Sequence, residues 1–222
     1  MSDVPALAIS ASNPCGDAAV SAALRWPDGR VVAAVAPAGA RSDLVATIAG
    51  LCREHGVRPP DLRELRLDLG PGSYTGLRVA VTFARFLMQY GNLAVLATDS
   101  LALLATAAVG QRGGRLRPLL DARRERFHLG CLQSADGGRL RQVDEPRAVA
   151  WSEVLASLQP GDLVVTPPTV AASRGEALRA RGAVVVVATG VTARDLFRPE
   201  LDLRPHTAAE LEPRYLMASY AE

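Results

Sequence analysis

Short runs of mainly apolar residues alternate with turn-forming residues along the first part of the chain. Such runs occur at 5–12, 17–25 and 30–36. The strings NPCG at 13–16 and PDG at 27–29 separate them, and both are typical of tight turns. The chain is therefore expected to begin with an antiparallel meander of three strands.

A helical pattern follows the meander. One apolar stripe at helical spacing comprises Leu44, Val45, Ile48, Leu51 and Cys52, as expected for an amphipathic helix. Ser42 is a plausible N-cap, with Asp43 behind it, and Gly56 ends the pattern. Strands are then predicted at 61–69, 94–98, 116–121, 126–133, 162–166 and 183–187, and helices at 79–90, 100–109, 151–158, 168–181 and 192–197.

This order of elements predicts a mixed α/β protein rather than a strict series of βαβ units. The glycine-rich break at 111–114 is the expected domain boundary. It divides the chain into a first lobe at 1–110 and a second lobe at 115–205. The remaining tail, 206–222, is expected to pack back on the first lobe.

The most specific feature of the sequence is the loop at 70–78. Its residues are Gly70, Pro71, Gly72, Ser73, Tyr74, Thr75, Gly76, Leu77 and Arg78. Glycines permit positive φ and close backbone approach, and Ser73 and Thr75 are both possible N-caps. Two interpretations are open: the loop and the helix after it bind a phosphate, or the loop is a tight corner that packs a helix against a sheet.

The helix after this loop favours the second interpretation. Gly76, Ala80 and Ala84 recur at spacing four, which would let another element approach its backbone. Phe83, Leu87 and other apolar residues lie almost all round it, and a helix of this kind is buried on more than one side. The second side is either the core of the same lobe or a subunit interface. Gly76, Ala80, Phe83, Ala84 and Leu87 are the interface candidates.

Composition removes several classes of enzyme. All 25 basic residues of the 222-residue chain are arginine. A P-loop needs a lysine for its phosphates, a protein kinase needs one on a strand, and a Schiff-base enzyme needs an amine nucleophile. The net charge is only +2 and the arginines are spread along the chain, so no basic tract marks a nucleic-acid footprint.

Metal and disulfide chemistry are not expected either. The three cysteines stand far apart without a CxxC pair, which fits the reduced cytosol. His55, His128 and His206 are isolated, so no catalytic residue, metal site or cofactor is predicted. The first residues lack the pattern of a signal peptide, and no apolar run approaches the roughly 20 residues of a membrane span. We expect a cytoplasmic protein.

The string GPGSYTGLR at 70–78 resembles the GPGSFTGLR signature of the bacterial TsaB (YeaZ) family. Further similarities follow in the same order. ALAISAS at 6–12 occupies the place of the family's first strand, and DSL at 99–101 matches a later segment. LLDAR at 119–123 resembles the aLDAR strand, and PRYL at 213–216 resembles the family's ending. The resemblance covers nearly the whole chain, although only 70–78 and 119–123 are specific.

The resemblance implies an actin-like, sugar-kinase-like and Hsp70-like fold of two related α/β lobes. It also implies a non-catalytic subunit in the threonylcarbamoylation of adenosine 37 in tRNA. In this family the transfer belongs to a homologous partner, a TsaD-type transferase that carries the metal-binding histidines. A small TsaE-type ATPase joins the complex. A homodimer through the helices of the first lobe is also implied, with tRNA contacted at most indirectly.

Three positions depart from the family pattern. Ser10 stands where the first strand usually carries an aspartate, Arg41 replaces a histidine, and Leu69 stands where an arginine or glycine is usual. Phosphotransferases of this fold use the first-strand acid to orient metal and phosphate, so Ser10 argues against ATP hydrolysis. The alternative function is a nucleotide- or acyl-CoA-dependent transferase with the 70–76 loop as its phosphate cradle.

Overall fold

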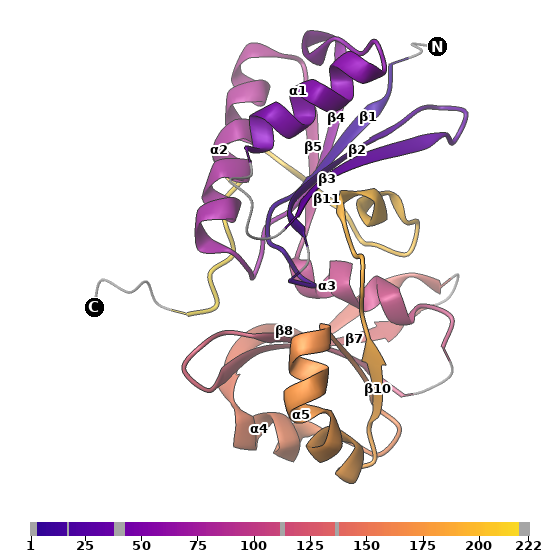
Figure 1. Ribbon diagram of the computed structural model, residues 1–222, viewed down its shortest axis with the longest axis vertical. Coiled ribbons are helices and arrows are strands. Elements are labelled where there is room, and N and C mark those ends of the chain that lie inside the picture. Colours follow the sequence, from indigo (N-terminus) through magenta and orange to yellow (C-terminus); the bar gives the residue numbers. More distant parts are fainter. Residues whose placement is uncertain (1–3, 17, 38–42, 112–113, 136–137, 218–222) are drawn as a thin grey trace.

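The computed structural model describes residues 4–16, 18–37, 43–111, 114–135 and 138–217, which form two α/β lobes stacked end to end (Figure 1). The predicted α/β class is confirmed. Among the described residues, no helix combines the length and the apolar character that crossing a bilayer requires.

The first lobe is built on a six-stranded sheet with the order β11-β5-β4-β1-β2-β3. The strands β1, β2 and β3 form the predicted antiparallel meander, and β1, β4 and β5 are parallel neighbours. Two helices cover one face of this sheet (Figure 1). The bounds are β1 (Ala6–Ser10), β2 (Ala18–Arg25), β3 (Val31–Pro37), α1 (Leu44–Glu54), η1 (Pro59–Asp61), β4 (Glu64–Asp68), α2 (Tyr74–Tyr90), β5 (Ala94–Thr98) and β11 (Arg204–His206).

The second lobe repeats this plan. Its sheet has the order β10-β9-β6-β7-β8, in which β6, β7 and β8 form an antiparallel meander and β6, β9 and β10 are parallel. Each lobe therefore has a meander followed by two parallel strands. The bounds are β6 (Leu116–Asp121), β7 (Arg126–Ser134), β8 (Leu140–Ala150), α4 (Trp151–Ser157), β9 (Leu163–Thr166), α5 (Pro168–Ala180) and β10 (Val184–Val187).

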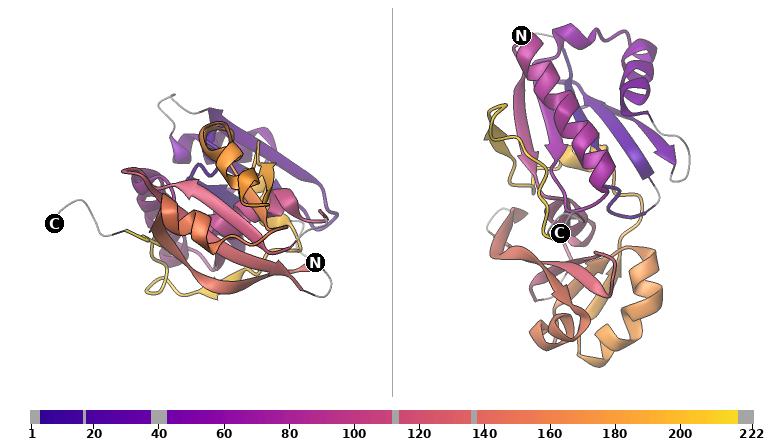
Figure 2. Two further views of the ribbon diagram at one scale, coloured as in Figure 1. Left: turned by 90° about the horizontal axis from the view of Figure 1, so that it is seen from below. Right: turned by 90° about the vertical axis from the view of Figure 1, so that its left-hand side faces the viewer.

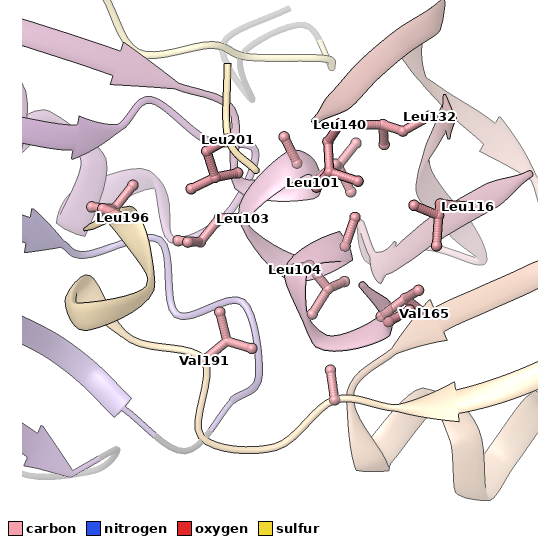
Figure 3. Packing of buried hydrophobic residues seen from close by; sticks show 14 of the residues in the cluster. Leu101, Leu103, Leu104, Leu116, Leu132, Leu140, Val165, Val191, Leu196 and Leu201 are labelled. Atoms are coloured by element: carbon pink, nitrogen blue, oxygen red, sulfur yellow. The ribbon is translucent and has the colours of Figure 1, made fainter. Parts of the chain in front are cut away.

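A shared apolar core joins the two lobes. The elements α3 (Ser100–Ala105), η2 (Thr106–Ala108) and η4 (Ala193–Phe197) lie between the two sheets. Leu101, Leu103 and Leu104 are fully buried there, and they pack in one cluster with residues of β6 and β9 in the second lobe (Figure 3). Folding thus buries one apolar surface that belongs to both lobes.

The structure differs from the sequence-based expectation at several places. The helix expected at 79–90 begins at Tyr74, so half of the signature string is its first turns. The strands β8 and β11 were not predicted. Because β11 pairs with β5 and η4 contacts β1, β2 and β4, the chain returns to the first lobe well before residue 205.

The start of α1 also differs. Asp43 is its N-cap, and Asp43 Oδ1 accepts hydrogen bonds from the backbone N–H groups of Val45 and Ala46 at 2.8 and 3.1 Å. The N-cap expected at Ser42 and the family departure at Arg41 lie outside the described residues. Val45, expected in the apolar stripe, is 51% exposed, so the buried stripe is narrower than its sequence spacing indicated.

Candidate functional site

The signature loop connects the end of β4 to the start of α2, beside the junction of the two lobes. Gly70 has φ +100°, a conformation that glycine adopts without strain. Ser73 is the N-cap of α2, and its Oγ accepts a hydrogen bond from the backbone N–H of Gly76 at 3.3 Å. Of the two N-caps suggested by the sequence, the structure therefore uses Ser73, and Thr75 lies within the helix.

Two glycines of the loop pack directly against the backbone that follows β1. A Cβ atom at Gly72 would lie 2.4 Å from the carbonyl oxygen of Ser12, and one at Gly76 would lie 2.2 Å from that of Ala11. The backbone N–H of Ser73 donates to the Ser12 carbonyl at 2.9 Å. Contacts this short leave no room for any side chain. Both glycines are thus accounted for by close packing of the loop and α2 against β1.

Beneath the loop, a buried carboxyl group lies among serine hydroxyls. Asp68, the last residue of β4, is fully buried, and its Oδ2 accepts a 2.7 Å hydrogen bond from Ser100 Oγ. The parallel register of β1 and β4 puts Ser10 beside it. Burial raises the pKa of Asp68, and the neighbouring hydroxyl groups of Ser12, Ser100 and Ser10 oppose this only in part. The acid beside Ser10 thus belongs to the interior.

Replacing Asp68 by asparagine is expected to stabilise the protein increasingly as the pH rises. The raised pKa means that the folded chain retains this proton above the pKa of the unfolded chain. Its contribution to stability is present in full below the unfolded pKa and is lost as the pH rises through the folded pKa. Asparagine does not titrate. Urea unfolding of both proteins from about pH 4 to about pH 8 measures the difference, and a difference independent of pH would contradict the prediction.

A cavity of about 680 Å³ lies against the signature loop, at the junction of the lobes. Its walls are the segment after β1, the loop itself, the end of β6, and the C-terminal tail. Asp121 and Arg123 of the LLDAR string line it, and Asp121 Oδ1 accepts from the Arg123 backbone N–H at 2.8 Å. Both specific sequence strings, far apart along the chain, thus meet at this cavity.

The three histidines lie in separate places. His128 lines the cavity, and desolvation lowers its pKa to about 4, against a smaller opposing effect of Asp121. His55 packs edge-on against Trp26 with ring centroids 5.9 Å apart, and His206 Nδ1 lies 2.9 Å from the Arg204 carbonyl oxygen. Within the described ranges, no three His, Cys, Asp or Glu residues group as a metal site would require.

The small-residue seam of α2 faces the interior of its own lobe. Ala80 and Ala84 are 1% and 0% exposed and belong to the first-lobe core, while Gly76 packs on Ala11. Of the two alternatives, core or interface, the burial of Ala80 and Ala84 favours the core of the same lobe. Gly76, the third interface candidate of this seam, is partly buried. Phe83 and Leu87, the other two candidates, pack on the edge of the same core and are only partly buried.

The opposite side of α2 exposes large apolar groups. Val79, Phe86 and Tyr90 are 44%, 56% and 72% exposed, and the last two rings pack with centroids 4.6 Å apart. Tyr74 is 44% exposed at the start of the helix, where Arg78 Nη1 donates to its hydroxyl at 2.8 Å. In the sequence, this exposed side is indicated by the apolar residues that lie almost all round the helix.

Comparison with known proteins supports the family resemblance that was based on the strings at 70–78 and 119–123. The family model described as TsaD, tRNA N6-adenosine threonylcarbamoyltransferase, matches residues 27–166, more than half of the chain. The tRNA threonylcarbamoyladenosine biosynthesis protein TsaB of Bacillus subtilis (strain 168) is 34% identical over 116 residues, which is 52% of this chain and 49% of that protein. The matched region thus spans about half the length of this curated relative.

Two solved structures share the whole fold. One is YeaZ from Pseudomonas aeruginosa, at 22% identity, and the other is an uncharacterised P. aeruginosa protein with similarity to peptidase YeaZ, at 23% identity. Each aligns with a TM-score of 0.72 and covers 96% of this chain and 100% of the other. With its actin-like, sugar-kinase-like fold of two related lobes, the chain belongs to the family that the TsaD model describes, and it is similar to the TsaB and YeaZ proteins.

Proposed function

We propose that this protein is a non-catalytic subunit that supports a TsaD-type transferase in the threonylcarbamoylation of adenosine 37 in tRNA. The observation that carries the proposal is the exposed apolar side of α2, formed by Val79, Phe86 and Tyr90. Aromatic residues concentrated on a solvated helix are typical of protein interfaces. The complex would form in the cytoplasm, with a TsaE-type ATPase joining it and tRNA contacted at most indirectly.

The kind of partner follows from the fold. A TsaD family model matches 27–166 of this chain, so a TsaD-type transferase is built on a related plan. Two related folds can pair through the same helix of each, as two identical chains do about a two-fold axis. A homodimer would use the same side of α2, and homodimer and heterodimer would therefore exclude each other.

A non-catalytic role is also supported by the site. The loop glycines serve packing against β1, and the first-strand position holds Ser10, which is 3% exposed. The acid beside it, Asp68, is fully buried. At the end of β1 a serine thus stands in place of a carboxylate. The carboxyl group at the end of β4 is buried in the interior, so it is not available to orient metal and phosphate in the cavity.

Phe86→Arg is expected to weaken binding to a TsaD-type transferase at least about tenfold, because a charge would be buried at the centre of the interface. Isothermal titration calorimetry measures the affinity. Val184→Arg is the matched control, since Val184 is 49% exposed on β10 of the other lobe and should leave binding unchanged. Unchanged binding of Phe86→Arg would remove this side of α2 from the interface.

The same variant tests the homodimer. Light scattering after gel filtration of the chain alone gives its mass, and Phe86→Arg is expected to be monomeric at concentrations where the unmodified chain is dimeric. A dimer that persists in Phe86→Arg while transferase binding is lost would show that the two assemblies use different surfaces.

A ligand-dependent transferase is the second candidate, because a cavity of about 680 Å³ beside the 70–76 loop has the size of a small-molecule site. Calorimetry with ATP and with acetyl-CoA on the isolated chain separates the two functions. Micromolar binding of either would favour the enzyme.

A further inference from the structure

The C-terminal tail leaves the first lobe and crosses the mouth of the cleft between the lobes. Leu211 is fully buried in the first-lobe core, which anchors the tail. The backbone N–H of Arg214 then donates to the Leu69 carbonyl at 2.6 Å, next to the signature loop. Seen from the side, the tail runs along the first lobe and reaches the junction of the lobes (Figure 2, right). We call residues 214–217 the strap.

The guanidinium of Arg214 contacts both lobes. Its Nη1 lies 3.7 Å from Asp99 Oδ2, at the start of α3, and its Nη2 lies 2.5 Å from Glu145 Oε2, on β8 of the second lobe. Arg214 also lines two cavities, the one of about 680 Å³ beside the signature loop and one of about 490 Å³ on the other side. Arg214 of the strap is thus part of the walls of both cavities.

The next two residues fill the cleft with apolar contacts. The ring of Tyr215 packs on Tyr74, at the start of α2, with centroids 5.0 Å apart. Leu216 packs against the apolar cluster that both lobes share. Tyr215 and Leu216 also line the larger cavity, together with Met217. Three consecutive residues of the strap thus contribute a cation, an aromatic ring and an aliphatic group to one cleft.

We propose that the strap is an internal ligand of the cleft, which holds the two lobes at one angle. In two-lobed proteins a bound molecule that contacts both sides of a cleft favours the closed arrangement. Here the chain's own residues make such contacts. This inference goes beyond the proposed function and does not depend on it, because it concerns the isolated chain.

The contacts are of a kind that can be released. The Glu145 side chain is 82% exposed, so its pair with Arg214 is screened by water and weak. Tyr215 is 45% exposed. Residues up to Leu211 remain anchored when the strap leaves the cleft, so release would not require the first lobe to unfold. Release would open the space between the two cavities and let the lobes pivot about the shared core around α3.

Distance measurement between spin labels tests the proposal on the full chain. Labels are attached at Gln89→Cys on α2 and Glu176→Cys on α5, both exposed positions in different lobes. The native residues Cys15, Cys52 and Cys131 are buried and should not react. We expect one narrow distance distribution with the native strap, and a broad or longer distribution in Arg214→Ala/Tyr215→Ala.

Three further variants complete the test. Tyr90→Ala removes an exposed ring from α2 outside the cleft and should keep the narrow distribution, as should Tyr215→Phe, which retains the packed ring. Glu145→Gln removes the charge that pairs with Arg214 on an exposed side chain, and should broaden the distribution in part. Circular dichroism verifies that each variant is folded. A distribution in Arg214→Ala/Tyr215→Ala identical to that of the native strap overturns the proposal.

Discussion

Replacing Gly76 by alanine is expected to cost about 3 kcal/mol of the free energy of unfolding. The added methyl group would lie 2.2 Å from the carbonyl oxygen of Ala11, and this obstacle is backbone rather than the end of a flexible side chain. The contact can be relieved only if α2 moves away from β1. Such a movement would also open the core formed by Ala80 and Ala84, which are buried against the same sheet.

Gly50 provides a matched control within the same lobe. It lies inside α1, and a Cβ atom there would meet no heavy atom within 4 Å. Alanine is favoured over glycine inside a helix by about 0.5–1 kcal/mol, so Gly50→Ala should stabilise the protein. The same substitution in two helices is therefore expected to have opposite signs.

Urea unfolding of the three proteins at one pH measures both effects, provided that the dependence on urea concentration has the same slope in each. Equal midpoints for Gly76→Ala and the unmodified protein would show that the loop is not packed against β1 as described. If Gly76→Ala instead kept its stability and lost binding of ATP or acetyl-CoA, the phosphate-cradle interpretation of the loop would be favoured.

The signature loop shows how far residue types alone can lead. Three glycines and a proline between a strand and a helix predict a close approach of backbone to something. They do not say whether that neighbour is a ligand or another strand. Either one can come this close only where the loop residue has no side chain. Only the position of Ala11 and Ser12, which come much earlier in the chain than Gly76 and Gly72, decides this.

The small-residue seam of α2 illustrates the same limit. The spacing of Gly76, Ala80 and Ala84 correctly indicates a surface that another element approaches. Helical periodicity is identical whether that element belongs to the same lobe or to a partner. In the structure it is the lobe's own sheet. The proposed interface therefore lies on the other side of the helix, around Phe86 and Tyr90.

Most of the elements were predictable because their apolar patterns are strong, whereas β8 was not. Its sequence, LRQVDEPRAVA, mixes charged and apolar residues without regular alternation and contains Pro146. It lies at the edge of its sheet, paired with β7, and at an edge proline is tolerated and charged side chains can face solvent. An edge strand of this kind owes its conformation to its neighbour, and periodicity carries little information about it.

The domain boundary predicted at 111–114 does not divide the apolar core. Residues on both sides of this boundary pack in one cluster. The helix α3 precedes the break in sequence, so this division places it in the first lobe. Its leucines nevertheless pack with Leu116 and Val165 of the second lobe (Figure 3). A helix that is apolar on every side is the corresponding feature of the sequence. The lobes are therefore expected to unfold together.

Replacing Leu104 by alanine tests this expectation and should cost about 2–5 kcal/mol of the free energy of unfolding. Leu104 is fully buried between the lobes, and the cavity left behind would be lined by rigid elements of both. Leu178→Ala is the control, because Leu178 is equally buried in a cluster made only of second-lobe residues. Its loss should be of similar size.

The two tryptophans of the chain report on the lobes separately, since Trp26 packs against the first-lobe core and Trp151 against the second-lobe cluster. Fluorescence of variants that keep only one of them, with phenylalanine in place of the other, follows each lobe during urea unfolding. Because the core is shared, Leu104→Ala should shift both transitions equally, and Leu178→Ala should shift the Trp26 transition although it lies in the other lobe. If Leu178→Ala left the Trp26 transition in place, the lobes would be independent units that merely touch, and the angle between them would have to be fixed by the strap alone.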